Sequence, residues 1–526
     1  MEQKSSSPST VRGLFPDWFT RSRKGIMLAL LLLVLFALAY AQSPLFTSNQ
    51  NQYFLRGAAM AGVGDLADDW LVSTKDSTPV FSFLARLVFQ YFDPVLFYMI
   101  YAVLLGLFLL SLVGICYSLR PEMQPRFALM LTVLLITLHS AALRYVLGRI
   151  PGDHWEYLLE AGFAGQRLLG PVLQPSSFGV LLLFSIFLYM RRKPFAAVLM
   201  AVLAATVHPT YLLSAAALTL AYMAGTWLET RKLKQPMLIG LAALAAVLPV
   251  LAYVAGSFTP TSAEVTRRAQ ELLVTFRIPQ HTQIAMWFDV TAVFKLLMLT
   301  GALVLTRRTR LFPLLLVPSS VMVLLTGLQV ALDSNQMALL FPWRLSTWLV
   351  PLSLAVLASA ALKLLLTRYD QLKPVPLILA GSVLLVVLLA AVGGAKFRIE
   401  YQRRQADPAV PMMAYVRKHS EGEQVYMIPP KLQIFRLQTG EPVMVEFKSI
   451  PYQDEEVLEW YNRVKLAQNF YRNKIEYIDC DRLDEASELY GVTHVVLGKN
   501  QLGLSCPGME EQYRDDAYGV YLLDPE

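Results

Sequence analysis

Long apolar stretches alternate with short polar segments over the first three quarters of the chain. A helix needs about 20 apolar residues to cross the hydrocarbon core of a bilayer. Stretches of roughly that length or somewhat shorter recur along the chain, and we interpret each as a membrane-crossing helix. They are residues 25–44, 93–116, 127–146, 177–190, 195–208, 210–228, 236–255, 289–306, 311–332, 345–366 and 375–394. The pattern predicts an α-helical polytopic membrane protein with about 11 transmembrane helices.

The first stretch has a second interpretation. Basic residues up to Lys24 precede its apolar core, which ends at Ala39-Tyr40-Ala41, as in a cleavable signal peptide. The further apolar stretches and the aromatic residues ahead of the first one favour a retained helix. Cleavage would leave the predicted orientation of the rest unchanged.

Lysine and arginine residues predict the orientation. They gather in every second loop, for example in 191–193 and 307–310, whereas the longer loops between them hold few. Cytoplasmic loops carry an excess of Lys and Arg. We therefore predict a multi-pass membrane protein with its N-terminus in the cytoplasm and its C-terminus on the opposite, outer side.

Composition excludes several classes of protein. Hydrophobic residues make up 55% of the 526 positions and charged residues 16%, whereas soluble domains carry about 25% charged residues. The chain is too apolar to be disordered, and three cysteines are too few for a disulfide framework. The net charge of +7 follows from the basic loops and does not indicate nucleic-acid binding.

The composition changes past Gly394, where charged residues return. We divide the chain into a cytoplasmic N-terminal tail (1–24), a transmembrane domain (25–395) with a large first outer loop (45–92), and a periplasmic domain (396–526). Runs typical of buried strands alternate with helical patterns in the last part. The strands are expected at 424–428, 494–497 and 519–523, and the helices at 409–419, 454–470 and 483–490.

This alternation predicts a C-terminal exported α/β domain with a largely parallel sheet. No Gly-rich phosphate loop opens its helices, so a nucleotide site is not indicated. Cys480 and Cys506 both fall in this domain, and the sequence leaves open whether they are bridged.

The first outer loop carries a cluster of carboxylates, Asp65, Asp68 and Asp69. One interpretation is a general base held over a membrane cavity, and the other is a capped, charged turn at the membrane surface. Arg56, in the same loop, is a candidate for substrate binding. No metal site and no cofactor are predicted, although a divalent cation near these carboxylates is left open.

Other candidates lie near the predicted ends of spans. Asp153 and His154 are interpreted as substrate-binding, or as part of a solvated loop, and no second histidine lies at metal-ligand spacing. His208 ends the fifth stretch. An ionisable residue at membrane depth indicates a function; the alternative interpretation is that this position only marks the place where Pro209 breaks the helix. Arg344 offers forked donors to a phosphate, unless it only extends toward water.

The layout resembles the GT-C superfamily of integral membrane glycosyltransferases, in an uncharacterised bacterial branch. This resemblance implies a location in the bacterial inner membrane, with the C-terminus in the periplasm. The segments Gly64-Asp65 and Asp69-Trp70, followed by Pro79, are similar to the loop of aminoarabinose and mannosyl transferases. In those branches an acidic pair opens the loop, whereas residues 49–52 here are amides, which cannot act as bases. The resemblance thus implies a polyprenyl-phosphate-linked sugar donor and makes Asp69, then Asp65 or Asp68, the expected base.

The leading functional prediction is a membrane glycosyltransferase. It would move a sugar from a polyprenyl-phosphate carrier to an exported glycan, lipid or protein acceptor, with membrane lipid and no nucleic acid as further partners. The amides at 49–52 favour a non-catalytic assembly protein of a surface polysaccharide pathway as the alternative. A lipid-carrier transporter is less favoured, because internal repeats are not seen. The sugar, the acceptor, the catalytic competence and the oligomeric state stay open.

Overall fold

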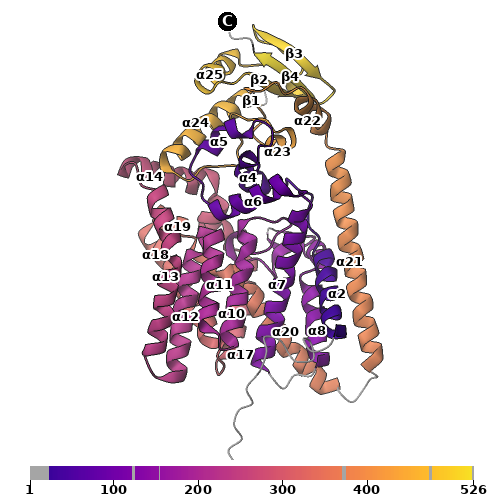
Figure 1. The fold of residues 1–526 in the computed structure, drawn as a ribbon, viewed down its shortest axis with the longest axis vertical. Coiled ribbons are helices and arrows are strands. Elements are labelled where there is room, and N and C mark those ends of the chain that lie inside the picture. Colours follow the sequence, from indigo (N-terminus) through magenta and orange to yellow (C-terminus); the bar gives the residue numbers. More distant parts are fainter. Residues whose placement is uncertain (1–22, 121–124, 153, 370–374, 473–476, 524–526) are drawn as a thin grey trace, which may run out of the picture.

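The computed structural model describes residues 23–120, 125–152, 154–369, 375–472 and 477–523. A bundle of long helices forms the larger part, and the C-terminal region covers one end of it (Figure 1). The bundle helices are α2 (Arg23–Tyr40), α7 (Leu96–Leu119), α8 (Pro125–Leu138), α9 (Ala141–Leu147), α10 (Val180–Met190), α11 (Pro194–Val207), α12 (Leu212–Thr230), α13 (Lys234–Ser257), α17 (Val290–Thr306), α18 (Phe312–Leu332), α20 (Ser346–Tyr369) and α21 (Val375–Gln405).

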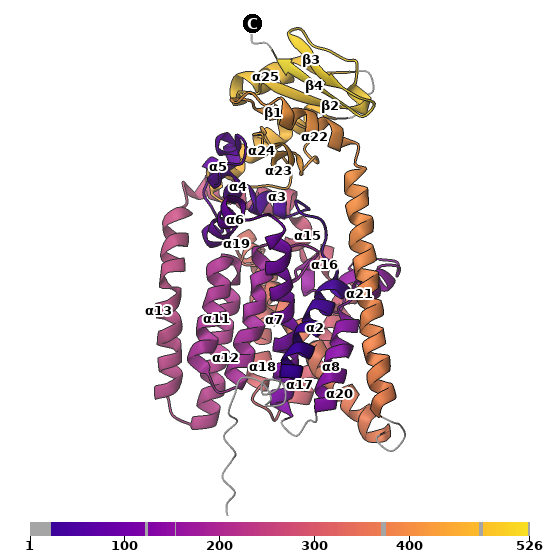
Figure 2. The ribbon, with the colours of Figure 1, turned by 45° about the vertical axis from the view of Figure 1, so that its right-hand side comes forward.

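Short helices connect the bundle helices, and many of them lie toward the end that faces the C-terminal region (Figure 2). They are α3 (Gln50–Tyr53), α4 (Leu55–Met60), η1 (Leu66–Asp68), α5 (Trp70–Ser73), α6 (Pro79–Tyr91), η2 (Trp155–Tyr157), η3 (Phe163–Gly165), η4 (Pro175–Gly179), η5 (Pro209–Tyr211), α14 (Ala263–Leu272), η6 (Leu273–Arg277), α15 (Pro279–Thr282), α16 (Ile284–Trp287), α19 (Asn335–Leu339) and η7 (Pro342–Leu345).

The expected count of eleven spanning helices is wrong. Among the described residues, six helices are long and apolar enough to cross a membrane, or seven if the pair Phe127–Leu138 and Ala141–Leu147, bent by 48°, is one span. The stretches predicted at 177–190, 195–208 and 289–306 form apolar helices of only 10–17 residues, and the apolar part of α2, Ile26–Tyr40, falls in the same range. At 1.5 Å per residue these cover about 15–26 Å, less than the hydrocarbon core of about 30 Å. The protein is a polytopic helical membrane protein with fewer full-length spans.

Pro209 explains why helix α11 is short. α11 ends at Val207, and Pro209 then opens the short helix η5 before α12 begins. Proline has no N–H to continue the hydrogen-bond ladder of the preceding helix. The observed helix therefore has nearly the bounds of the predicted stretch 195–208, and it is too short to count as a full span.

The C-terminal region follows α21, which runs unbroken through the predicted boundary at residue 395. The region contains a four-stranded sheet in the order β1-β2-β4-β3. Its elements are α22 (Ala409–Lys418), β1 (Tyr426–Met427), α23 (Phe435–Thr439), α24 (Asp454–Phe470), α25 (Cys480–Tyr490), β2 (His494–Gly498), η8 (Lys499–Gln501), β3 (Met509–Arg514) and β4 (Tyr518–Leu523).

The expectation of a largely parallel sheet is wrong. Among the described strands, β1 and β2 pair in parallel, whereas β4 pairs antiparallel with both β2 and β3. β3 and β4 form a hairpin, and in its turn the Asp515 carboxylate accepts the backbone N–H of Ala517 and of Tyr518 at 2.7 Å. The sequence signal for β3 is weak because its residues are mostly polar and exposed.

The sheet has a hydrophobic cluster on each side. Val495 and Leu497 of β2 belong to one cluster, and Val496 belongs to the other. Alternate residues of a strand point to opposite faces, which explains why β2 is buried throughout. A disulfide between Cys480 and Cys506, whose Cα atoms are 5.6 Å apart, ties α25 to the segment before β3.

Candidate functional site

A cavity of about 650 Å³ lies where the helical bundle meets the C-terminal region. Its wall is assembled from segments far apart in the sequence. They are residues 48–53, 165–176, 208–213, 254–258, 277–281, 339–347 and 448–452, together with Ser77. The volume is in the range of about 300–1,000 Å³ that is typical of small-molecule sites.

Four cationic side chains line this cavity: Arg167, Arg277, Arg344 and Lys448. The wall, as far as the structure describes it, contains no aspartate or glutamate. An excess of cations over anions in one concave site focuses a positive potential, which raises the local concentration of anions. The cavity is therefore suited to an anionic ligand.

Arg344 is positioned by polar side chains from the junction of α11 and α12. Its Nη1 lies 3.3 Å from Nε2 of His208 and also donates to the hydroxyl of Thr210. The guanidinium carbon lies 4.9 Å from the ring centroid of Phe341. Both Nε of Arg344 and Nδ1 of His208 are buried without a hydrogen-bond partner. The structure thus brings together two of the residues that the sequence singled out.

Arg277 and Lys448 couple the bundle to the C-terminal region. Arg277 donates from Nη2 to the backbone oxygen of Lys448 at 2.5 Å, and Lys448 donates from Nζ to Ser48 Oγ at 2.6 Å. Burial lowers the pKa of both side chains. For Lys448, the neighbouring Arg277 lowers the pKa further. A bound anion would offset this repulsion between the two cations.

The amide run at 49–52 contributes to the wall and to the local fold. Asn49 donates to Oε1 of Gln174 at 2.7 Å, and Gln52 donates to the hydroxyl of Tyr452 at 3.2 Å. Gln50 instead accepts the backbone N–H of Phe46 at 2.8 Å. Asn49, Gln52 and Tyr452 line the cavity, so this segment offers it hydrogen bonds and no charge.

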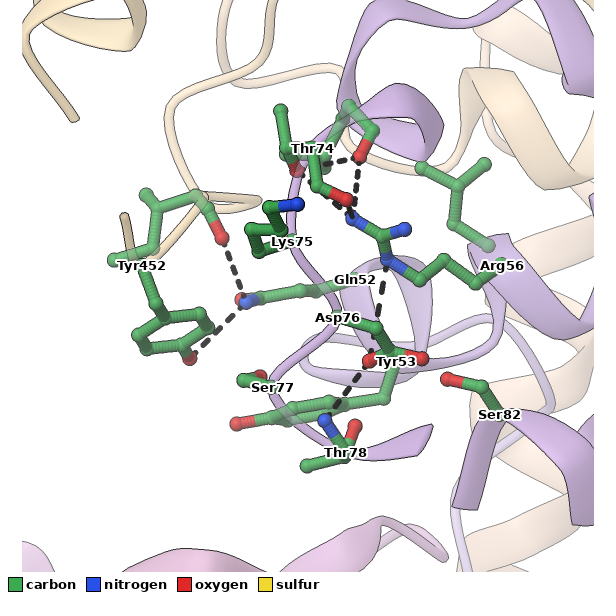
Figure 3. Close-up of a pocket in the computed structure, with 13 residues that line it drawn as sticks. Gln52, Tyr53, Arg56, Thr74, Lys75, Asp76, Ser77, Thr78, Ser82 and Tyr452 are labelled. Carbon is green, nitrogen blue, oxygen red and sulfur yellow. Dashed lines mark hydrogen bonds and ion pairs between the residues drawn. The ribbon is translucent and has the colours of Figure 1, made fainter. Parts of the chain in front are cut away.

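Arg56 lies in a smaller neighbouring pocket of about 30 Å³, shown in Figure 3. Its guanidinium donates to the backbone oxygens of Leu71 and Val72 at 2.9 and 2.7 Å and lies 3.9 Å from Asp76. These partners use most of its donors. Arg56 therefore holds the segment around residues 71–76, and it does not line the large cavity.

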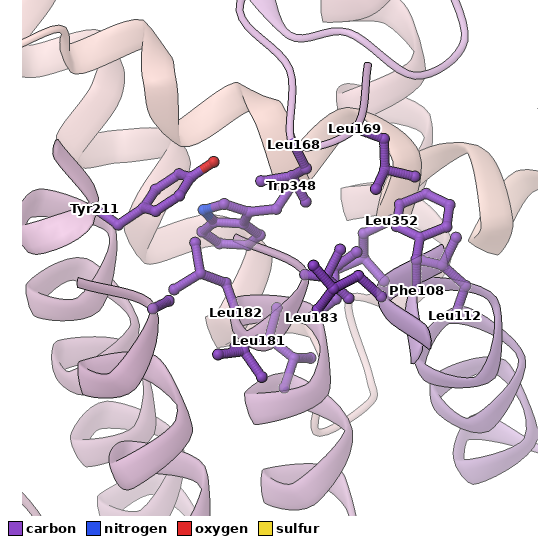
Figure 4. Packing of buried hydrophobic residues seen from close by; sticks show 14 of the residues in the cluster. Phe108, Leu112, Leu168, Leu169, Leu181, Leu182, Leu183, Tyr211, Trp348 and Leu352 are labelled. Atoms are coloured by element: carbon purple, nitrogen blue, oxygen red, sulfur yellow. The ribbon is translucent and has the colours of Figure 1, made fainter. Parts of the chain in front are cut away.

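The helical core adjoins the cavity at Tyr211. Tyr211 lines the cavity, donates to the backbone oxygen of Ser176 at 2.7 Å and is buried. It belongs to the same packed cluster as Trp348 of α20 and Leu182 of α10 (Figure 4). Dense packing of this kind holds side chains in fixed rotamers, so this wall is rigid.

His281 is a cavity residue that the sequence did not single out. Its Nδ1 lies 2.6 Å from the backbone oxygen of Ala164. Burial, together with the charges of Arg344, Arg277 and Arg167, lowers the pKa of His281 to about 4, against the hydrogen bond to Ala164. The imidazole is therefore neutral at pH 7.

The carboxylate cluster of the first loop faces the C-terminal region and not the cavity. Asp69 is fully buried, and its Oδ2 accepts from Arg436 Nε at 2.7 Å and from the backbone N–H of Val443 at 2.9 Å. Asp65 donates its backbone N–H to Gly440 at 2.8 Å, and Asp68 is exposed. The side chain of Asp69 therefore has structural partners, in contrast to the expected free carboxylate.

The second predicted loop site lies beside the cavity. His154 Nδ1 is 3.2 Å from Asp289 Oδ2, and neither residue lines the cavity. Asp153 lies outside the described residues. In the part of the chain that the structure describes, no three His, Cys, Asp or Glu side chains gather to hold a metal ion.

Sequence reasoning missed four contributors to the cavity: Arg167, Arg277, His281 and Lys448. The arginines were used only as topology signals, and neither His281 nor Lys448 was considered as a candidate. A usable signal was present, because Arg167 and Arg277 are basic residues in loops that otherwise hold few. Lys448 lies in a segment whose approach to the cavity depends on the fold of the C-terminal region.

Residues 408–467 match the family model described as a domain of unknown function (DUF6798). A comparison with curated proteins finds no match. The matched segment includes three residues of the cavity wall, Lys448, Ile450 and Tyr452. It also includes Arg436, the partner of Asp69.

Proposed function

We propose that the protein is a membrane glycosyltransferase of GT-C-like layout that binds a polyprenyl-phosphate-linked sugar in the 650 Å³ cavity. The observation that carries this proposal is the convergence of Arg167, Arg277, Arg344 and Lys448 on one cavity. Phosphate is recognised by guanidinium forks and by ammonium groups. In the transfer reaction these cations would stabilise the charge that develops on the leaving phosphate.

The wall of the cavity also fits the lipid part of such a ligand. Leu212 and Leu213 of α12, Val254 of α13 and Phe258, which directly follows α13, belong to its lining. Large apolar residues of α13, such as Leu244, are exposed to the surroundings of the bundle. A prenyl chain leaving along this side would remain in contact with apolar groups, while its phosphate lies among the cations.

The orientation is part of the same proposal. The N-terminus lies in the cytoplasm and the C-terminal region in the periplasm of a bacterial inner membrane, as the distribution of Lys and Arg predicts. The disulfide between Cys480 and Cys506 supports this placement, because disulfides persist in oxidising compartments. The acceptor is then an exported glycan, lipid or protein.

A non-catalytic assembly protein of a surface polysaccharide pathway is the second candidate. The observation that favours it is the absence of carboxylates from the described cavity wall. Such a protein would bind the lipid-linked sugar and present it to other components without breaking the bond to phosphate.

The experiment has two stages. Native mass spectrometry of the protein in nanodiscs compares undecaprenyl phosphate with undecaprenol, which lacks the phosphate. The proposal predicts selective binding of the phosphate, weakened about tenfold in Arg344→Lys because a point charge replaces a fork. Arg268→Lys is the matched control, since Arg268 forms an exposed ion pair with Glu271. Equal binding of both lipids would contradict the proposal.

The second stage separates the two candidates. Membranes of a deletion strain, complemented with the wild type, receive undecaprenyl phosphate esters of mannose, glucose, galactose and aminoarabinose in turn. Release of undecaprenyl phosphate that depends on the protein indicates transfer. Binding without release from any donor indicates the assembly protein.

A further inference from the structure

Glycosyl transfer in this cavity requires a proton acceptor other than a carboxylate. The acceptor hydroxyl loses its proton as it attacks the sugar, so a base must lie within hydrogen-bond reach. The described wall contains no Asp or Glu, and its two imidazoles are His208 and His281. Asp69, the base expected from the sequence, is bound to Arg436 and to backbone N–H groups outside this wall.

His208 already uses its lone pair. Its Nε2 lies 3.3 Å from Nη1 of Arg344. A guanidinium only donates hydrogen bonds, so Nε2 of His208 is the acceptor in this pair. Protonation of His208 at this nitrogen would place two cations in contact, which makes it a poor base.

His281 has the opposite arrangement. Its Nδ1 lies 2.6 Å from the backbone oxygen of Ala164. A carbonyl oxygen only accepts hydrogen bonds, so Nδ1 carries the hydrogen and the lone pair is on Nε2. The described residues provide no hydrogen-bond partner for Nε2, and the ring lines the cavity. A histidine fixed through Nδ1 with Nε2 directed at the reacting group is the arrangement used by general bases.

We propose that His281 accepts the proton of the acceptor hydroxyl during glycosyl transfer, an inference that rests on the proposed function. The acceptor oxygen forms a bond to the anomeric carbon, and the bond from that carbon to the phosphate oxygen breaks. The electron pair of the broken bond leaves with the phosphate, which the cations hold. The proton moves to Nε2 of His281 and later passes to water.

The surrounding charges set the pKa of His281. The pKa of His281, lowered to about 4 by burial and by Arg344, Arg277 and Arg167, lies where ordinary carboxylates titrate. The hydrogen bond to Ala164 opposes this lowering. A bound phosphate offsets the charge of the arginines and so raises the pKa of His281. The base therefore becomes stronger when the donor is in place.

The test compares three variants in the donor assay with deletion-strain membranes. His281→Gln removes the base and keeps a polar side chain, so turnover should fall about 100-fold or more. His281→Glu restores a base and should recover part of that loss. His419→Gln is the control. Nδ1 of His419 also lies at hydrogen-bond distance from a backbone oxygen, 2.9 Å from that of Tyr415, but this histidine is exposed on the C-terminal region. KM for the donor should remain within about twofold in His281→Gln and His419→Gln, since the phosphate contacts are unchanged. In His281→Glu the KM should rise, because the new carboxylate repels the phosphate.

Binding of undecaprenyl phosphate to the same variants separates this inference from the proposed function. Retained binding with lost turnover in His281→Gln supports the role of His281. Wild-type turnover in His281→Gln overturns that role and leaves the proposed function intact. Binding by the wild type with no turnover of any donor overturns both the role of His281 and the transferase, and leaves the assembly protein.

Discussion

Asp69 and Arg436 form a buried ion pair with 2.7 Å between Oδ2 and Nε, although 367 residues separate them in the sequence. The pair joins the first loop to the segment that matches the family model. Glu446 lies 3.6 Å from Nη1 of the same arginine, and burial raises the pKa of this glutamate against the effect of Arg436. Asp69 from the first loop and Arg436 and Glu446 from the C-terminal region therefore form one buried charged cluster. This cluster holds the two parts together.

The first prediction is a loss of stability in Asp69→Asn. The substitution removes one carboxylate from a buried arginine, and breaking such a pair costs about 3–5 kcal/mol. Thermal unfolding in detergent should show a clear drop in Tm. Asp68→Asn is the control, because Asp68 is exposed, and its Tm should equal that of the wild type. A normal Tm for Asp69→Asn together with lost turnover would instead restore Asp69 as the base.

The second prediction concerns the disulfide. Cys480 and Cys506 are separated by 26 positions, and closing a loop of this length stabilises a fold by about 3 kcal/mol. In the double variant Cys480→Ser/Cys506→Ser, amide exchange over residues 480–514 should become faster, while exchange in the bundle stays the same. Wild-type protein treated with a reducing agent should behave like the variant. Unchanged exchange in both would contradict the prediction.

The third prediction is a pH dependence from His494. Burial lowers the pKa of His494 to about 4, whereas an unfolded histidine titrates near about 6.5. Its contribution to stability is complete above that value and is lost as the pH falls from about 6.5 toward 4, because the unfolded state binds the proton first.

His494→Gln isolates this contribution from the other titrating groups. The Tm of the wild type should fall on going from pH 7.5 to pH 5. The fall should be smaller in the variant, whose absolute Tm is lower because the ring of His494 stacks on Tyr426 with 4.8 Å between centroids. Identical pH profiles in both proteins would show that His494 does not titrate in this way.

The fourth prediction tests whether the matched segment takes part in ligand binding. Lys448→Met removes a cation from the cavity and keeps an unbranched chain, so the affinity for undecaprenyl phosphate should fall about tenfold, the value of one charge-assisted hydrogen bond. Lys418→Met, an exposed position in the same segment, should bind as the wild type does. Equal losses in the two variants would indicate a general effect of net charge.

Apolar patterning predicted the helical membrane part because the bundle is built from such stretches, several of which reach full length. The same pattern overestimated the number of spans, since short stretches such as 177–190 and 195–208 were counted although their helices have only 10–17 residues. In the C-terminal region, strand β2 was predicted because it is buried throughout, whereas β3 was missed because it is polar. Hydrophobicity alone does not register an exposed edge strand.

Cavity residues were singled out from the sequence only where the residue type and its position at the end of a stretch both indicated a function. Arg344 was chosen for its forked donors and His208 because an ionisable group at membrane depth is costly; both line the cavity. Asp69 looked exposed because its partner, Arg436, lies in a distant segment. His281 was missed because its neighbours in the sequence carry no motif, and only the fold brings Ala164 to its ring.

A structure of the protein in nanodiscs with undecaprenyl phosphate tests the central claim most directly. The account predicts the phosphate inside the cavity, within hydrogen-bond distance of Arg344 and of Arg277 or Lys448, with the prenyl chain along Val254 and Phe258. An empty cavity at saturating lipid, or a phosphate bound away from all of these cations, would contradict the account.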